Sequence, residues 1–183
     1  MEYFEFYDNT IRRGSNDVQR SKQHIGKIKL NNVIIDNIIP VINKLEECGC
    51  EIKKQKSSVI LKSPKKLKSV DIKTMPYPGF PTDMQSVFAS ILTVAKGTSV
   101  IVENIFENRY RYMSELKKMG AKITVEGKTA VIKGVRRLSG AKVASTDLRG
   151  GAALVTAALA AKGTTQITNI EYILRGYENL DVK

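Results

Sequence analysis

The chain contains three copies of one sequence pattern, and this repeat restricts its fold more than any other feature. Segments that start at Gly26, Gly97 and Gly163 each place a polar residue, alternating apolar positions and an asparagine after the glycine. In the first two copies a second glycine, Gly49 or Gly120, follows at the same distance. Such self-similarity indicates a supersecondary unit copied along the chain. We expect the third copy to be cut short at Lys183, before its hairpin.

The periodicities within a copy predict the order of its elements. Residues after each opening glycine alternate as a strand does, and Met113, Leu116 and Met119 recur like one face of a helix. Residues 121–134 form two β-rich stretches about Gly127, which is typical of a hairpin. Each unit is therefore predicted to contain a strand, a helix, a hairpin and then a second helix.

The second helix of each unit is apolar around its whole circumference. It spans residues 84–95 in one copy and 152–161 in another, and both copies open with Thr-Asp and close with Ala-Lys-Gly. A helix that is hydrophobic all round is a buried helix. We therefore predict an α/β fold of the inside-out barrel type, one incomplete domain over residues 25–183, with these helices in the interior and the strands around them.

Composition excludes several classes of protein. No apolar run approaches the ~20 residues of a membrane-spanning helix, and the acidic N-terminus is unlike an export signal, so we expect a cytoplasmic protein with no membrane partner. Two cysteines and one histidine are too few ligands for a structural zinc site. We expect Cys48 and Cys50 to be reduced thiols at the end of a helix.

The net charge of +12 attracts phosphate groups of any kind. Eight lysines fall between Lys53 and Lys73, without the interleaved aromatic residues that stack on bases. A solvated, lysine-rich hairpin is therefore favoured over nucleic-acid binding, which stays as an alternative of a different class.

Asp83 and Asp147 each follow a threonine at the start of an apolar helix. Simple N-capping would explain one such pair, because these side chains accept the free amide hydrogens of the first turn. Two features favour a functional site: three prolines stiffen the loop "PYPGFP" before Asp83, and Arg149 places a cation two residues after Asp147. Helix N-termini attract anions, and a fixed carboxylate can take a proton from a substrate hydroxyl.

Several segments resemble a known family. "YPGFPTDMQ", "GTSVIVENIFENRYRYMSELKKMGAKI", "GVRRLSGAKVASTDLRGGAALVTAALAAKGTT" and "RGYENL" are similar to the C-terminal part of the UDP-N-acetylglucosamine 1-carboxyvinyltransferase family of enolpyruvyl transferases. The resemblance runs from about Ile25 to Leu180. It implies two inside-out α/β domains of three repeats each, with the active site between them. It also implies transfer of the enolpyruvyl group of phosphoenolpyruvate to the 3'-hydroxyl of UDP-N-acetylglucosamine, without a metal or organic cofactor.

The resemblance also implies roles for particular residues. Asp83 corresponds to the carboxylate that contacts the sugar hydroxyl and is the favoured base, and Arg175 corresponds to the arginine that grips phosphoenolpyruvate. The implied substrate-binding residues are Asp83, Ile105, Glu107, Arg109, Asp147 and Arg149. Without the resemblance, surface salt bridges would explain Glu107, Arg109 and Arg175.

The chain departs from the family pattern in ways that affect function. The family's reactive cysteine belongs to the other domain, so we expect this chain to hold half of the cleft and to be inactive alone. Residues 1–24 diverge from the family, and residues 10–24 contain one Ile and one Val, too few for an interior helix. We therefore expect residues 1–24 to be a divergent, disordered N-terminal segment, and we expect a vacancy where one core helix belongs.

Three origins of such a chain stay open at this point: a fragment, a frame-shift product, or half of a split enzyme. The corresponding functions are a transferase completed by a separate chain that carries the missing domain, a non-catalytic nucleotide-sugar-binding module, and a basic protein associated with nucleic acid.

Overall fold

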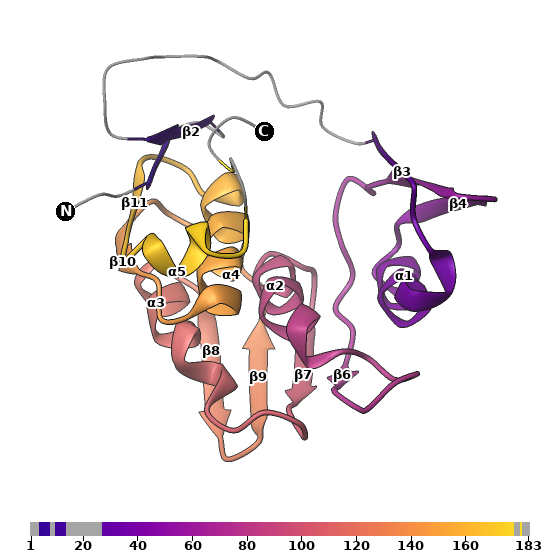
Figure 1. The fold of residues 1–183 in the computed structure, drawn as a ribbon. Helices are drawn as coiled ribbons and strands as arrows, with labels where there is room; N and C mark the ends of the chain where they lie inside the picture. The colour runs from indigo at the N-terminus through magenta and orange to yellow at the C-terminus, as the bar shows by residue number, and fades with distance from the viewer. Residues whose placement is uncertain (1–3, 8–9, 14–26, 178–179, 181–183) are drawn as a thin grey trace.

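The computed structural model describes residues 4–7, 10–13, 27–177 and 180, and it divides them into three related units (Figure 1). The first unit is a three-stranded antiparallel sheet of order β3-β5-β4 with a helix that leads into β4. Its elements are β3 (Lys27–Asn31), η1 (Ile35–Ile38), α1 (Ile39–Glu47), β4 (Glu51–Gln55) and β5 (Ser58–Lys62). The lysine-rich region thus contains the β4–β5 hairpin, as the sequence predicts.

The second unit shows the complete set of elements. They are β6 (Ile72–Lys73), α2 (Thr82–Leu92), β7 (Thr98–Val102), η2 (Arg109–Tyr112), α3 (Met113–Lys118), β8 (Lys122–Glu126) and β9 (Thr129–Lys133). The sheet order is β6-β7-β9-β8, with β6 parallel to β7 and the other pairs antiparallel. Gly120 ends α3 at φ +89° and Gly127 makes the β8–β9 turn at φ +54°, which confirms both predictions.

The third unit is completed from the other end of the chain. Its own elements are β10 (Lys142–Ala144), α4 (Leu148–Ala160), β11 (Thr165–Thr168) and α5 (Glu171–Leu174). A hairpin of β1 (Phe4–Tyr7) and β2 (Thr10–Arg13) adds to β11, which gives the order β10-β11-β1-β2. This order and these directions repeat those of β6-β7-β9-β8, so β1 and β2 take the places that β9 and β8 take in the second unit.

This hairpin differs from what the repeat alone predicts. The repeat predicts a third unit that is cut short at Lys183, before its hairpin. The strands come instead from the N-terminus, which is far from the third unit in the chain. The N- and C-terminal parts of the chain therefore meet in one sheet (Figure 1).

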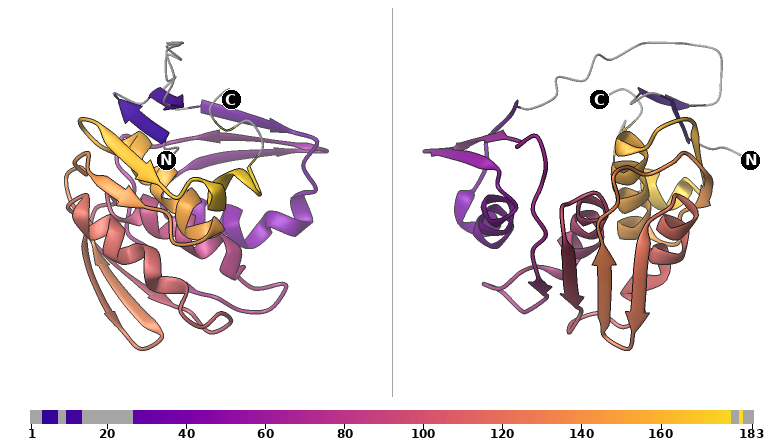
Figure 2. Two further views of the ribbon diagram at one scale, coloured as in Figure 1. Left: turned by 60° about the vertical axis from the view of Figure 1, so that its left-hand side comes forward. Right: turned by 180° about the vertical axis from the view of Figure 1, so that it is seen from behind.

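The two apolar helices pack against each other inside the molecule, with the sheets outside (Figure 2). Small side chains allow the close approach: the Ser90 hydroxyl of α2 donates a hydrogen bond of 2.7 Å to the Ala153 carbonyl of α4. Phe88, Ala89 and Leu154 are at most 1% exposed. The prediction that these helices run through the interior is confirmed along this contact.

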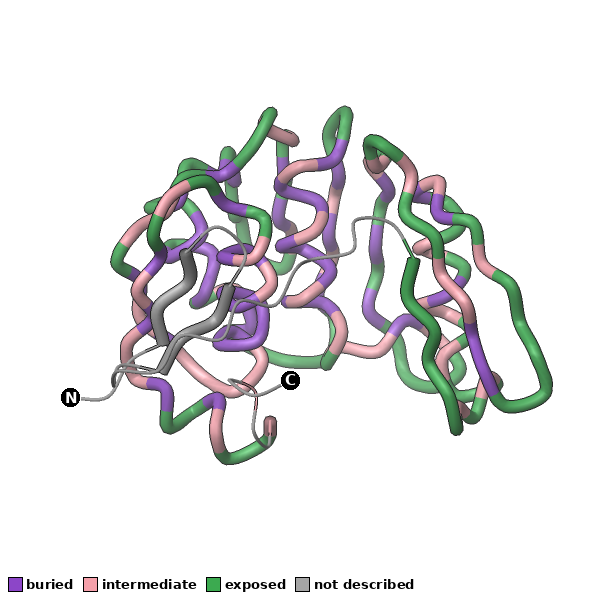
Figure 3. The backbone as a smooth tube through the Cα atoms, turned by 90° about the horizontal axis from the view of Figure 1, so that it is seen from above, coloured by how far each residue is buried: buried purple, intermediate pink, exposed green. Residues whose placement is uncertain are grey.

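Burial differs between the units (Figure 3). The core is built from α2, α3, α4 and the inner faces of their sheets, whereas every residue of β3 is exposed.

Among the described residues, no helix is long and apolar enough to cross a membrane.

Candidate functional site

A short loop presents Asp83 at the start of α2. Phe80 anchors this loop, because its side chain is 5% exposed and packs edge-on against Phe88 with ring centroids 5.5 Å apart. The Met75 amide donates to the Phe80 carbonyl at 3.0 Å, and the Gly79 amide donates to the Pro76 carbonyl at 2.8 Å. The chain enters α2 through Pro81, whose side chain offers no cap. The Asp83 carboxylate is therefore not used as a helix cap.

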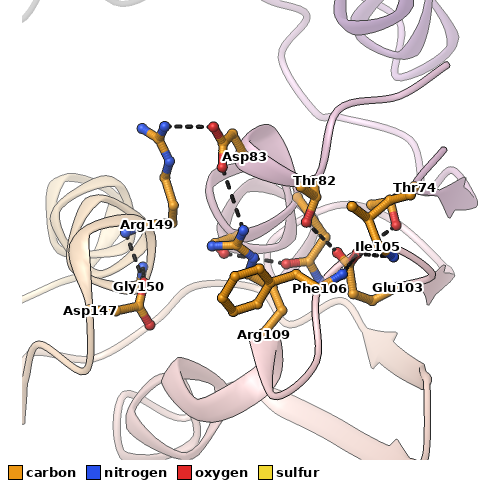
Figure 4. Close-up of polar contacts among 12 residues, drawn as sticks. Thr74, Thr82, Asp83, Glu103, Ile105, Phe106, Arg109, Asp147, Arg149 and Gly150 are labelled. Atoms are coloured by element: carbon orange, nitrogen blue, oxygen red, sulfur yellow. Dashed lines mark hydrogen bonds and ion pairs between the residues drawn. The ribbon is translucent and has the colours of Figure 1, made fainter. Parts of the chain in front are cut away.

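Asp83 instead faces two arginines (Figure 4). Its Oδ2 accepts a hydrogen bond of 2.6 Å from Nη2 of Arg149, and its Oδ1 lies 3.5 Å from Nη2 of Arg109. The Asp83 carboxylate raises the pKa of the Arg149 guanidinium above its ordinary value. Arg109 is 7% exposed and stacks on the Phe106 ring at 4.1 Å, whereas the Asp83 side chain is 53% exposed. A fixed cation thus lies beneath an accessible carboxylate.

Asp147 has a different role from Asp83, although both follow a threonine. It is the N-cap of α4, and its Oδ1 accepts hydrogen bonds from the amides of Arg149 and Gly150, both at 2.9 Å. Its Oδ2 lies 3.1 Å from the Thr146 hydroxyl. Capping therefore explains Asp147, and it holds the first turn that carries Arg149.

Glu103 is the main organising residue of the site, although it is not among the residues that the sequence motifs predict. The side chain is 4% exposed and lies at the end of β7. Its Oε1 accepts from the Thr74 hydroxyl at 2.7 Å and from the amides of Ile105 and Phe106 at 2.9 and 3.0 Å. Its Oε2 accepts from the Thr82 hydroxyl at 3.0 Å, next to Asp83. One buried carboxylate therefore joins the Asp83 helix to the loop that carries Arg109.

The loop over residues 103–111 lines a surface pocket of about 300 Å³, together with Val125, Gly127 and Lys128. The Tyr110 hydroxyl lies 2.9 Å from the carbonyls of both Ile101 and Lys128, and burial raises the pKa of Tyr110 to about 12. Its proton is therefore available for these hydrogen bonds at neutral pH. Asp83 is not among the residues that line this pocket, and its carboxylate is instead accessible on the protein surface.

The remaining predicted site residues are not among the partners of the Asp83 carboxylate, which contacts Arg109 and Arg149. The Arg175 guanidinium lies 5.7 Å from the centre of the Tyr172 ring and is exposed. Glu107 is exposed and lines the pocket, and the Ile105 side chain is 46% exposed while its amide is bound to Glu103. Within the residues that the structure describes, no three His, Cys, Asp or Glu side chains gather as metal ligands would.

The fold and the site together define an α/β protein of repeated units with a carboxylate–arginine cluster at the mouth of an interior helix. The family model of EPSP synthase (3-phosphoshikimate 1-carboxyvinyltransferase) matches residues 24–182. The chain belongs to this family of enolpyruvyl transferases, as its sequence motifs predict.

Individual relatives have the name that the motifs suggest. The chain is 53% identical over 158 residues to UDP-N-acetylglucosamine 1-carboxyvinyltransferase 1 of Caldanaerobacter subterraneus, covering 86% of this chain and 38% of the relative. It is 55% identical over 158 residues to UDP-N-acetylglucosamine 1-carboxyvinyltransferase of Desulfofundulus thermocisternus, covering 86% of this chain and 65% of the relative. The chain thus spans less than two thirds of the length of either relative.

Solved structures share the fold. The enolpyruvyl transferase NikO from Streptomyces tendae superposes with a TM-score of 0.77 at 26% identity, over 85% of this chain and 37% of that one. EPSP synthase from Acinetobacter baumannii superposes with a TM-score of 0.67 at 18% identity, over 83% of this chain and 39% of that one. The mixed α/β enolpyruvyl-transferase fold is therefore confirmed for the part of those structures that the chain matches.

Proposed function

We propose that this chain binds UDP-N-acetylglucosamine and phosphoenolpyruvate and supplies half of the site for enolpyruvyl transfer. The observation that carries the proposal is the Asp83 carboxylate, held between Arg109 and Arg149 on an exposed surface. The names of the relatives, at 53% and 55% identity, support the choice of the nucleotide sugar.

In the proposed reaction Asp83 is the base. The 3'-hydroxyl oxygen of the sugar bonds to C2 of phosphoenolpyruvate, the bond from C2 to the phosphate oxygen breaks, and inorganic phosphate leaves. The hydroxyl proton passes to the Asp83 carboxylate, which needs to lie within hydrogen-bond reach of it. Arg149 and Arg175 supply positive charge for the anionic groups of the substrates.

The other predicted residues shape the binding surface in this proposal. Ile105 and Glu107 belong to the loop that Glu103 holds in place, and in this proposal they contact the nucleotide sugar. Asp147 acts through the cap that positions Arg149. No metal or organic cofactor takes part in the proposed reaction.

We propose that residues 25–183 form one domain of an inside-out α/β barrel, and that a separate domain or chain completes the cleft. The length of the matched relatives supports this, since the chain spans 38% of the Caldanaerobacter protein. The chain alone should then bind substrate without turning it over. We assign this activity to the cytoplasm, as the composition of the sequence predicts.

Isothermal titration of the chain with UDP-N-acetylglucosamine tests the proposal. Binding heat is expected with the nucleotide sugar and not with a DNA oligomer of mixed sequence at the same salt concentration. Heat with DNA alone would overturn the proposal in favour of a basic nucleic-acid-associated protein. Release of phosphate from phosphoenolpyruvate by the isolated chain would show that half a cleft suffices.

Two arginine variants separate a specific site from general basicity. Arg149→Ala removes the guanidinium that contacts Asp83 and is expected to weaken nucleotide-sugar binding about tenfold or more, the usual effect of losing a charged hydrogen bond. Arg136→Ala removes an exposed arginine outside the cluster and is the matched control. Equal weakening by both variants would show that net charge alone drives binding.

A further inference from the structure

The inner face of the first sheet is uncovered at a position where the other two sheets are covered. Counted from the opening glycine of each repeat, Leu30 of β3 corresponds to Ile101 of β7 and Ile167 of β11. Ile101 and Ile167 are 0% exposed, whereas Leu30 is 50% exposed and Ile28, on the same face, is 58% exposed. Leu30 pairs with Val59, which is 3% exposed, so this face is the one that looks inward.

The edge of the first sheet is open as well. In the second unit β6 lies parallel to β7, and in the third unit β10 lies parallel to β11. Each of these added strands leads into the apolar helix of its unit. Within the described residues β3 pairs with β5 alone. No described strand therefore lies on the other edge of β3, where β6 lies on β7 and β10 lies on β11.

One face of α2 is also incompletely covered. Val87 and Ile91 lie one helical turn apart and are half-buried, although α2 is buried along its contact with α4. The front and rear views place the first unit on the side of α2 that is away from α4 (Figures 1 and 2). The uncovered part of α2 and the uncovered face of β3 are therefore the surfaces that a third interior helix would join.

We propose that a strand–helix segment from outside residues 1–183 docks on this surface. Its strand would add parallel to β3, and its helix would be about three turns long and apolar all round, covering Leu30 and Ile28 and packing on α2. The two equivalent segments of this chain define this chemistry, since α2 and α4 are 11 and 13 residues long and each follows a strand that pairs in parallel with the next strand.

The source of the segment is the portion of an enolpyruvyl transferase that the matched residues leave out. The chain covers 38% of the Caldanaerobacter relative, and residues 10–24 are too polar to supply the helix. This inference depends on the repeat geometry and not on the proposed function, because the segment would dock with no nucleotide sugar present. A second copy of this chain is the competing occupant.

The test mixes the full chain with the part of the 53%-identical Caldanaerobacter relative that lies outside the matched 158 residues, produced as a separate polypeptide. We expect a one-to-one complex by light scattering on a sizing column. Hydrogen exchange should slow in residues 27–31 and 84–94 on mixing. Both readouts are independent of substrate, so failure of nucleotide-sugar binding would leave this result unaffected.

A replacement of one exposed leucine is the test variant, and a replacement of one exposed valine is its control. Leu30→Lys places a charge on the proposed surface and is expected to weaken the complex by more than about tenfold. Val131→Lys changes a residue of β9 that is 38% exposed in the second sheet, and should leave the complex unchanged. Absence of a complex, self-association of the chain in its place, or equal effects of both variants would overturn the proposal.

Discussion

At the scale of single residues, burial decides which carboxylate organises the site. Glu103 has one acidic oxygen bound to three donors and the other bound to Thr82, whereas Glu107 four residues later is exposed. A buried carboxylate is retained only when donors replace its water. Glu103 therefore fixes the geometry of the loop, and Glu107 is free to meet a ligand.

Replacing Glu103 by Gln should destabilise the protein by about 1–3 kcal/mol, because an amide hydrogen would then face groups that already donate. Amide exchange at Ile105 and Phe106 should speed up, since their acceptor is weakened. Urea unfolding and hydrogen exchange measure the two effects. Glu107→Gln is the matched control and should change stability by less than about 0.5 kcal/mol.

The two thiols should be poorly reactive in the folded protein. Burial raises the pKa of Cys48 from 9.0 to about 11 and also raises the pKa of Cys50. Thiolate is the reactive form, so at pH 8 Cys48 should alkylate about a hundredfold more slowly than an unperturbed cysteine. Mass spectrometry after iodoacetamide treatment, with and without urea, measures this; equal rates in both conditions would contradict it.

The same shift affects stability at high pH. Because the folded state holds the Cys48 proton to a higher pH than the unfolded state does, its contribution is present below pH 9 and is lost as the pH rises to about 11. The Cys48→Ser variant should therefore show a weaker dependence of its free energy of unfolding on pH over that interval.

At the scale of elements, the start of a helix determines what its first acidic residue can do. The carboxylate of Asp147 turns back onto the amides of α4 because the residue itself is the N-cap, in extended conformation at φ −172°. In α2 Pro81 takes the N-cap position, and Asp83 is the second residue of the helix, in its first turn, with its carboxylate directed to the arginines. Similar Thr-Asp sequences thus produce a structural cap and an accessible acid.

Removing each acid should have different consequences. Asp147→Ala should destabilise the protein by about 0.5–2 kcal/mol, the usual cost of a lost N-cap. Asp83→Asn should change stability by less, because the Asp83 side chain is 53% exposed and its ion pairs are largely solvated. Urea unfolding of both variants gives the comparison, and equal losses would show that Asp83 also acts mainly as a structural group.

At the scale of the whole molecule, the two ends of the chain share the third sheet. The β1–β2 hairpin covers the edge of β11 that β9 covers on β7 in the second unit. An uncovered strand edge leaves backbone groups unpaired and favours association with other chains. The N-terminal hairpin therefore contributes to the third unit although it lies far from that unit in the sequence.

Deleting residues 1–13 should expose the edge of β11. Amide exchange in Thr165–Thr168 should then accelerate, while exchange in Thr98–Val102 of β7 stays unchanged, since the hairpin does not pair with β7. Hydrogen exchange followed by mass spectrometry measures both strands in one experiment. Unchanged exchange in β11 would show that the hairpin does not protect this edge.

Much of the local structure follows from the sequence. The glycines at positions 49, 120 and 127 adopt positive φ where the repeats predict helix ends and a turn. The apolar helices and the β8–β9 hairpin also occur where periodicity places them. Glu103 is not predictable in this way, because its partners Thr74 and Thr82 are 29 and 21 residues away and meet it only after the sheet and helix have packed.

The amino-acid sequence by itself determines the repeated unit, the interior character of two helices and the family, because these depend on periodicity and on motifs that are local in the chain. The tertiary structure decides which of the two Thr-Asp carboxylates is accessible, which glutamate is buried and where the N-terminal hairpin pairs. These outcomes depend on contacts between residues far apart in the sequence, and local patterns do not specify such contacts.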